Sequence, residues 1–405
     1  MNEPNPSIAN RRATTVSMLV AVVMIAQQVA GKAARDAFFL SHFPASALPA
    51  VMVAATVLSF GVIFVISRIL RTVPPAKAAP WIFTCNGALF VAEFALSGPQ
   101  PHVTAVMIYL HIAALGAAAV SIFWSVVSEC FDPHRAKRAI ARIAVGASFG
   151  GVIGGVSGWQ LGKVVSLPVL FLILALANVV CALGIASLSG PRARPTSVGK
   201  APSAMDVMRE TPYLRLLAVL VALGAMTDTV VDFVFKASAQ AEYSSSGDLM
   251  SFFAIFYAVT GILTFLSQTT LVERSLRTNG LIGTVASRPG FMIGGALFVL
   301  AFPRFLFTVI LRGGAQVVEN SFYRSGYEIL YTPLTPDKKR PTKTLIDVGL
   351  ERIGVAVGAG CVLLVVALAP SHADSALFGV AALAAITSLF VCSRLHRGYV
   401  DALVD

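Results

Sequence analysis

The sequence predicts an all-α integral membrane protein with about twelve transmembrane helices in two six-helix pseudo-repeat bundles. Three observations support this fold class. The 405 residues are 56% hydrophobic and only 13% charged, which is too apolar for a water-soluble globule. Apolar stretches of roughly 20 residues recur along the whole chain, and that is the length a bilayer of about 30 Å requires. Basic residues gather in alternate loops between these stretches.

The apolar stretches define the spans. We place them near residues 14–34, 46–70, 79–98, 103–129, 139–162, 167–189, 213–236, 249–272, 282–302, 304–330, 341–369 and 374–394. The polar start "MNEPNPSIANRR" lacks the small-residue cleavage site of a signal peptide, so we expect the first span to be retained.

The net charge is +11, and the basic residues responsible for it lie mainly in the loops between the spans. Loops such as "SGPQPH" and "SHAD" carry almost no basic residues, whereas the loops between them carry many. This alternation is the positive-inside pattern, which places both termini in the cytoplasm and argues against a nucleic-acid partner. The basic positions are Arg11, Arg12, Arg68, Arg71, Lys77, Arg135, Lys137, Arg138, the 190–212 linker, Arg274, Arg277, Lys338, Lys339, Arg340, Arg394 and Arg397.

The chain divides into two halves at its one long Pro/Ser/basic stretch, "SGPRARPTSVGKAPSAMD". We predict an N-terminal six-helix bundle at 1–189, a cytoplasmic linker at 190–212 and a C-terminal six-helix bundle at 213–405. Six spans, a linker and six spans are the layout of major-facilitator-type transporters, whose halves are repeats around a central site.

Polar residues support an internal repeat. Gln28, Lys32 and Asp36 in the first span match Asp228, Asp232 and Lys236 in the seventh at an offset of 200, and spacing by four puts each trio on one helical face. In the fifth and eleventh spans, "RIAV" and "RIGV" match at an offset of 210, which also aligns Gly150 with Gly360.

Glycines and cysteines favour structural roles. The runs "GASFGGVIGGVSG" and "GVAVGAG" give their helices flat faces for close packing, and no strand precedes them as a phosphate-binding loop would need. The cysteines lie in or near spans without metal-site spacing, so we interpret them as small core residues and expect no metal or disulfide. They are Cys85, Cys130, Cys181, Cys361 and Cys392.

Charges recur inside several spans, where they are costly and usually face a protein interior or an aqueous pathway. The stripes comprise Ser121, Ser125 and Glu129 beside Phe123 and Trp124; Arg312, Gln316 and Glu319; and Lys343, Asp347 and Glu351, with Arg352 pointing away from Lys343. The pairs Arg324–Glu328 and Lys343–Asp347 could equally neutralise each other, and Glu93 in the third span belongs to no stripe. The set as a whole predicts a solute pathway.

The energy source is not nucleotide hydrolysis, because no G-x-x-x-x-G-K-[ST] motif occurs. Secondary transport, by exchange or ion coupling, remains, and the carboxylates of Glu129, Asp228 and Asp232 are candidate proton carriers. No nucleophile–base or metal-ligand constellation indicates an enzyme, and no cofactor is implied.

One late block carries a family resemblance. "YEILYTPLTPDKKRPTKTLIDVGLERIGVAVGAG" resembles the nucleotide transporter family, the ATP/ADP translocases of plastids and intracellular bacteria. The matching positions are Glu328, Tyr331, Pro333, Leu334, Lys343, Ile346 and Asp347. Weaker similarity covers "KAARDAFFLSHFPASALPAV", "FWSVVSE" followed by "AKR", "VDFVFK" and "YAVTGILTF", and so spans most of the chain.

The resemblance implies a divergent, free-living bacterial branch and a protein of the bacterial inner membrane. It assigns a substrate-critical cation to Arg35, the seventh-span acid to Asp232 and the late lysine to Lys343. The family has an acidic residue in its fourth span, but the corresponding positions here are His111 and Ile112, so that acid is absent. The aromatic run that follows Ala-Lys-Arg in the family is replaced by "AIARIAVGASFGG".

The leading hypothesis is therefore a secondary transporter of nucleotides or related phosphorylated anions that works by alternating access. Arginine and lysine would engage phosphate oxygens, acidic residues would hold those cations in the unloaded site, and Trp124 could stack a base or simply pack. A monomer is compatible with this plan. The predicted substrate-binding residues are Lys32, Arg35, Asp36, Trp124, Glu129, Asp232, Lys236, Arg312, Glu319, Lys343, Asp347 and Arg352.

Two alternatives remain. The first is a transporter of a different organic anion or an amphipath by proton coupling, which the absent fourth-span acid favours. The second is a non-transporting membrane sensor or scaffold on the same fold, which the charged stripes in both halves oppose.

Overall fold

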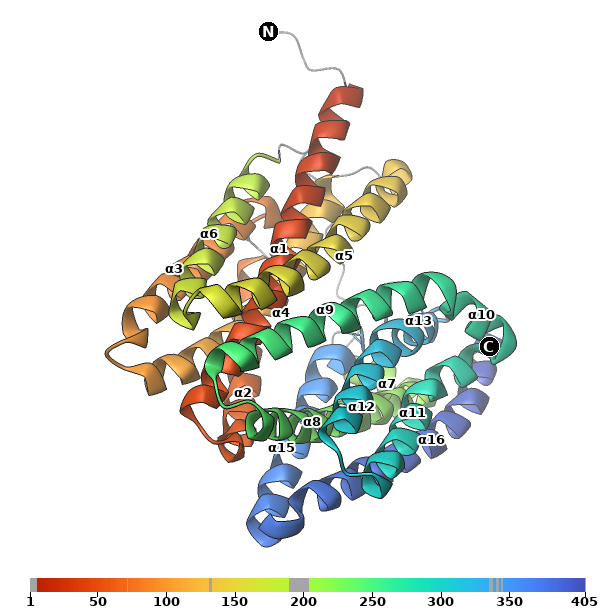
Figure 1. Cartoon of the computed structure of the whole chain (residues 1–405). Coiled ribbons are helices and arrows are strands. Elements are labelled where there is room, and N and C mark those ends of the chain that lie inside the picture. The colour runs from red at the N-terminus through yellow and green to blue at the C-terminus, as the bar shows by residue number, and fades with distance from the viewer. Residues whose placement is uncertain are drawn as a thin grey trace. The chain divides into compact units, whose positions relative to one another are not determined.

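A computed structural model describes the backbone of residues 6–70, 72–130, 133–188, 204–334, 338, 339, 342, 343 and 345–404. Within these ranges the chain is helical and contains no strand (Figure 1). Residues 190–203 of the predicted linker, with Arg71 and Arg340, lie outside them. The described end of that linker contains the short helix α7, Ala204–Glu210.

The chain forms two compact units. Unit 1 consists of residues 1–44, 54–195 and 243–262, and unit 2 of residues 45–53, 196–242 and 263–405. The domain boundaries at 189 and 213 that the sequence suggests stay a prediction, because each unit also includes a short segment from beyond them.

Unit 1 is built from α1, α3, α4, α5 and α6, the part of α2 that follows residue 53, and the first part of α9. Their bounds are α1, Pro6–His42; α2, Leu48–Ile69; α3, Pro75–Ser97; α4, Pro101–Cys130; α5, Pro133–Val164; α6, Leu167–Ala186; and α9, Ser246–Thr270. Helix α1 lies along α5, and α3 lies along α6 (Figure 1). The core between them includes Phe83, Phe123 and Ile143, none of which is exposed.

Unit 2 contains the remaining helices. Their bounds are η1, Ala45–Ala47; α8, Pro212–Glu242; α10, Val272–Thr278; α11, Gly280–Ala301; α12, Phe305–Val318; η2, Glu319–Tyr323; α13, Arg324–Ile329; η3, Leu345–Leu350; α15, Glu351–Leu368; η4, Pro370–His372; and α16, Ala373–Val404. Helix α8 packs against both α15 and α16, and α11 packs against α16. The core of unit 2 includes the buried rings of Tyr213, Tyr327 and Tyr331.

Ten helices among the described residues are long and apolar enough to cross a membrane. They correspond to ten of the twelve predicted spans. The fifth predicted span is the glycine-rich helix α5, which is long enough but less apolar. The tenth is divided among α12, the π-helix η2 and α13, so no single long helix covers it.

Glycines make the tightest helix crossings. A Cβ atom on Gly150 or Gly154 of α5 would lie 2.3 Å from the carbonyl oxygen of Val22 or Ala26 on α1. These contacts confirm the packing role that the sequence suggested, because only glycine permits such backbone approach.

The same crossing recurs in unit 2 between α15 and α8. A Cβ on Gly354 would lie 2.2 Å from the oxygen of Ala222, and one on Gly358 would lie 2.7 Å from that of Met226. Val22 and Ala26 correspond to Ala222 and Met226 at the predicted offset of 200. The fifth-span offset of 210 is wrong, however, because the contacts match Gly150 to Gly354, an offset of 204, and Gly360 has nothing within 4 Å.

The cysteine interpretation holds only in part. Cys181 and Cys392 are buried free thiols, as core residues should be, whereas Cys130 and Cys361 are half-buried. Cys85 is exposed on α3, so it is not a core residue.

Candidate functional site

The stripe on α8 carries the first part of the site. Lys236 Nζ lies 2.8 Å from Asp232 Oδ2, one helical turn away, and the lysine side chain is only 2% exposed. Arg312 reaches the other oxygen from α12, with Nε 3.0 Å and Nη2 2.9 Å from Asp232 Oδ1. One carboxylate therefore holds two cations, one from its own helix and one from another.

A second group lies one turn earlier on α8. Arg288 of α11 forms an ion pair and hydrogen bond with Asp228, and its Nη2 lies 3.0 Å from Glu319 Oε1. The guanidinium carbon also lies 4.6 Å from the centre of the Tyr323 ring. A buried arginine is stabilised by such paired charges and by the face of an aromatic ring.

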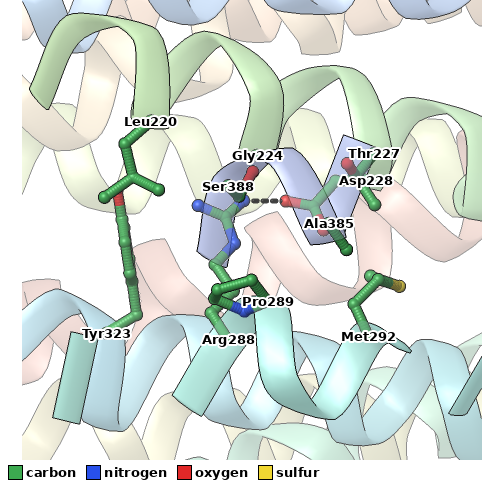
Figure 2. Close-up of a pocket in the computed structure, with 10 residues that line it drawn as sticks. All are labelled: Leu220, Gly224, Thr227, Asp228, Arg288, Pro289, Met292, Tyr323, Ala385 and Ser388. Carbon is green, nitrogen blue, oxygen red and sulfur yellow. Dashed lines mark hydrogen bonds and ion pairs between the residues drawn. The ribbon is translucent and has the colours of Figure 1, made fainter. Parts of the chain in front are cut away.

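This second group borders a pocket. Figure 2 shows Arg288 pointing from α11 toward Asp228 on α8, with Tyr323 standing beside it and Met292 at the other side. The hollow has an empty volume of about 280 Å³ and is partly open. Its remaining lining residues are Leu220, Gly224, Thr227, Pro289, Ala385 and Ser388.

The two groups together are balanced in charge. Counted as ionised, Asp228, Asp232 and Glu319 are three acids, and Lys236, Arg288 and Arg312 are three bases. An anion that replaces a carboxylate on these cations keeps their charge compensated. Because each cation has a carboxylate partner, none of these charges is buried alone, which offsets part of their desolvation cost.

Local backbone geometry positions Glu319 and Tyr323. They are the first and last residues of a π-helical turn that interrupts the tenth span. Such turns contain i→i+5 hydrogen bonds and occur often at functional sites. Pro289, next to Arg288, lies inside α11 and cannot donate a backbone hydrogen bond, so one helical hydrogen bond is missing there.

A third group contains the late lysine. Lys343 Nζ lies 2.7 and 2.6 Å from the two carboxylate oxygens of Glu328. Arg324 also contacts Glu328, at 3.3 Å, as the spacing of four suggested. Asp347 accepts a hydrogen bond from Tyr327 and lies 3.9 Å from Arg324. The pairing of Lys343 with Asp347 that the sequence left open is thus replaced by Lys343 with Glu328.

The π-helix η3 explains part of this difference. Asp347 lies inside η3, so the four-residue spacing to Lys343 and Glu351 does not represent one α-helical turn. Glu351 is exposed, and Arg352 beside it is half-buried at the start of α15.

Unit 1 has its own ion pair near the end of α1. Arg35 contacts Asp36 through Nε at 2.9 Å and Nη2 at 2.7 Å, and the Asp36 side chain is fully buried. Tyr257 of α9 donates a hydrogen bond to Asp36 Oδ2 at 2.7 Å. The ring centre of Tyr109 lies 4.6 Å from the Arg35 guanidinium carbon, and Lys32, one turn earlier, is exposed.

Two predicted residues lie apart from these groups. Trp124 is half-buried and packs against the hydrophobic core of unit 1, at 5.6 Å and nearly edge-on to Phe123. This contact agrees with the packing alternative for Trp124. Glu129 is half-buried near the end of α4, and no ion pair joins it to a described residue.

Sequence reasoning missed Arg288, Tyr257 and Tyr323. Arg288 left a usable signal, since it is a lone arginine beside a proline within an apolar span. Tyr257 and Tyr323 give no such signal, because the sequence does not show whether the hydroxyl of a tyrosine in a membrane helix contacts a charged group. Among the described side chains, no group of three or more histidines, cysteines and acids is placed to hold a metal ion.

Comparison with solved structures identifies the fold. A single-residue variant of the nucleoside transporter NupG aligns with a TM-score of 0.70 and 10% identity, covering 95% of this chain and 99% of that chain. A bacterial homologue of the iron transporter ferroportin, in an inward-facing state, aligns with a TM-score of 0.65 and 16% identity, covering 95% and 98%. A bacterial homologue of the human lysosomal transporter Spinster aligns with a TM-score of 0.59 and 14% identity, covering 98% of each chain.

The fold is thus that of the transporters with which the chain aligns, and together with the family match below it makes the protein a membrane carrier of the secondary-transporter class. The sequence profile described as TLC ATP/ADP transporter matches residues 192–399. The chain belongs to the TLC ATP/ADP transporter family. A search of the curated proteins finds no match by sequence.

Proposed function

We propose that this transporter moves nucleotides of the ATP/ADP type, or closely related phosphorylated anions, by alternating access and with exchange or ion coupling. Family membership supports the substrate class, since the matched profile is that of an ATP/ADP transporter. We further propose that it lies in a bacterial inner membrane with both termini in the cytoplasm, which the basic loops support.

The observation that carries this proposal is that two cationic side chains form ion pairs with the single carboxylate of Asp232. Two cations, Lys236 and Arg312, contact its two oxygens at 2.8–3.0 Å. A phosphate group presents oxygens with similar spacing and more negative charge, so it competes for the same donors. Arginine suits phosphate because its planar fork can form two parallel hydrogen bonds, and lysine adds a movable point charge.

The carboxylate also explains how the site remains stable between transport cycles. Removing one partner of a buried pair typically costs about 3–5 kcal/mol, since the other charge is left unpaired. Asp232 avoids this cost when no substrate is bound, and substrate phosphate avoids it when substrate is bound. Lys236 and Arg312 therefore have an anionic partner both with and without substrate.

Reconstituted vesicles provide the test. Labelled ATP uptake is measured with and without unlabelled ADP inside, for wild type, Arg312→Ala and Lys236→Ala. We expect counter-substrate to stimulate wild-type uptake and each substitution to abolish it. Arg277→Ala is the matched control, because Arg277 belongs to an ion pair that is 77% exposed and lies outside these groups. Wild-type vesicles that take up no nucleotide, or Arg312→Ala vesicles with full uptake, contradict the proposal.

A second candidate is transport of a different organic anion by proton coupling. The equal count of acids and bases around Asp232 favours it, because protonating one of those acids would free a cation for a carboxylate or sulfonate substrate just as well. Thermal-shift screening with nucleotides, sugar phosphates and carboxylates separates the candidates, since a ligand that binds only the folded state raises the melting temperature. Binding without flux in the vesicles would instead indicate the sensor or scaffold alternative.

A further inference from the structure

Unit 1 contains a buried acid–base pair that belongs to none of the groups above. Glu93 of α3 and His111 of α4 meet with Oε1 and Nδ1 2.8 Å apart. Their side chains are 0% and 5% exposed. Burying two titratable groups together in a membrane helix pair is costly, which makes an intramembrane pair a candidate functional site.

A chain of amides fixes the direction of the hydrogen bonds around this pair. Asn178 Nδ2 donates to the backbone carbonyl of Leu174 at 2.9 Å, so its Oδ1 must accept. Asn86 Nδ2 donates to that Oδ1 at 2.7 Å, which turns Asn86 Oδ1 toward His111 Nε2, 2.6 Å away. Because an amide oxygen only accepts, Nε2 of His111 carries a hydrogen.

The direction of these hydrogen bonds determines how many protons Glu93 and His111 hold between them. With Nε2 protonated, the contact between Nδ1 and Oε1 requires one further proton, held either by an imidazolium or by a carboxylic acid. Without that proton, two lone pairs face each other at 2.8 Å and the contact is repulsive. The pair is neutral with the proton and carries one negative charge without it.

A hollow with polar residues in its lining lies beside Asn86, the amide that contacts His111. Asn86 and Gln27 line a hollow with an empty volume of about 250 Å³, together with Gln28, Gly31, Phe90, Ile112 and Gly116. Glu93 Oε2 and Gln27 Oε1 are buried and have no hydrogen-bond partner among the described residues, so each can accept from water. The polar amides link this hollow to the imidazole ring.

Among the described residues, the charged residues of the surrounding helices do not contact the Glu93–His111 pair. Helix α6 contributes Asn178 and contains no acidic or basic residue. In the second half of α1, Lys32 is exposed, and Arg35 and Asp36 pair with each other. On α4, Tyr109 lies against Arg35. The Phe90 ring of α3 packs at 4.7 Å from that of His111, and the charged residues of α2 and α3 besides Glu93 are Arg68 and Lys77 near helix ends.

We propose that Glu93 and His111 form a proton-binding site that makes the proton a co-substrate of this carrier. Binding takes one proton from water to the shared position between Nδ1 and Oε1, and release returns it to water. Release removes the hydrogen bond between Glu93 of α3 and His111 of α4 and leaves the one between Asn86 and His111, so it weakens one of two described side-chain links between these helices. The coupling to transport rests on the proposed carrier function, whereas proton binding by the purified protein does not.

Purified protein without substrate tests the site first. Infrared difference spectra across a pH jump are recorded for wild type, Glu93→Gln and Glu273→Gln. We expect a signal from the gain and loss of the shared proton in wild type and in the Glu273→Gln control, which makes the same change in an exposed ion pair. We expect its loss in Glu93→Gln. The new amide can still donate to Nδ1, so this variant preserves the contact and imitates the protonated pair. Wild-type spectra without any such signal overturn the proposal.

Vesicles test the coupling. We expect wild-type uptake to rise with an inward proton gradient, and Glu93→Gln to lose this dependence while retaining exchange at equal pH. His111→Gln should lose it as well. A Glu93→Gln protein with the wild-type pH profile overturns the coupling. If wild type moves no nucleotide, the proposed substrate fails, but the spectra still decide whether the pair binds a proton.

Discussion

The guanidinium of Arg288 lies in the space that a side chain on Gly224 would occupy. A Cβ at position 224 would come within 2.5 Å of Nη1 and 2.7 Å of the guanidinium carbon. Helix α8 therefore admits the arginine of α11 only because residue 224 has no side chain. The ion pair of Arg288 with Asp228 depends on this absence as much as on charge.

Gly224→Ala should therefore impair transport in a folded protein. The arginine end is flexible, so we expect it to move away from Asp228 rather than unfold unit 2. Substrate uptake into vesicles should fall at least several-fold, with a melting temperature close to that of wild type. Gly360→Ala is the control, because position 360 has nothing within 4 Å. Equal uptake by both variants would show that the position of Arg288 is unimportant.

Gly154→Ala should destabilise unit 1. The added methyl group would meet the backbone oxygen of Ala26 at 2.3 Å, and a backbone cannot move aside as a side-chain end can. Overpacking of this kind costs about 1–3 kcal/mol. Thermal unfolding in detergent should show a lower midpoint. Gly151→Ala, on the same helix with its nearest atom at 3.9 Å, should leave the midpoint unchanged. Equal midpoints for the two variants would contradict the tight crossing.

Charge exchange should identify the partner of Lys343. Lys343→Glu places an acid against Glu328, and we expect reduced expression and reduced uptake. Adding Glu328→Lys restores opposite charges at 2.6–2.7 Å and should recover part of both. The stabilising effect is modest, about 1 kcal/mol or less, because both side chains are partly exposed. Recovery with Asp347→Lys in place of Glu328→Lys would show that the sequence pairing is the correct one.

Tyr257→Phe should weaken the hold on Asp36. The variant keeps the ring and removes the hydroxyl that donates to Oδ2 at 2.7 Å. Losing a donor to a buried acceptor costs about 1–3 kcal/mol, so the melting temperature should fall. Tyr243→Phe, just before the same helix, keeps its ring contact with Phe252 and serves as the comparison. A larger fall for Tyr243→Phe would contradict a special role for Tyr257.

The sequence predicts the helices well because hydrocarbon imposes a strong length and composition rule. The stripe of Asp228, Asp232 and Lys236 was also predictable, since its residues share one helix and regular spacing fixes their face. Ten predicted spans appear as single long apolar helices. The tenth span does not, because periodicity arguments assume α-helical turns and give no sign of the π turn at Glu319.

Contacts between helices were harder to predict. The acid absent from the fourth span illustrates this, since a carboxylate reaches His111 from Glu93 of the third span instead. Nothing in either helix alone connects the two residues, and Glu93 remained unassigned until the fold placed them together. Arg288 was missed for a related reason, because its partners lie on α8 and η2.

The backbone-to-backbone crossings at Gly150 and Gly154 have a mechanical consequence. Sliding α1 along α5 would bring residues with side chains into positions that only glycine can occupy, so the two helices should move as one rigid unit. The same holds for α8 and α15 through Gly354 and Gly358. Spin labels on the outer faces of either pair should then report one unchanging separation throughout the working cycle, whatever else in the carrier moves.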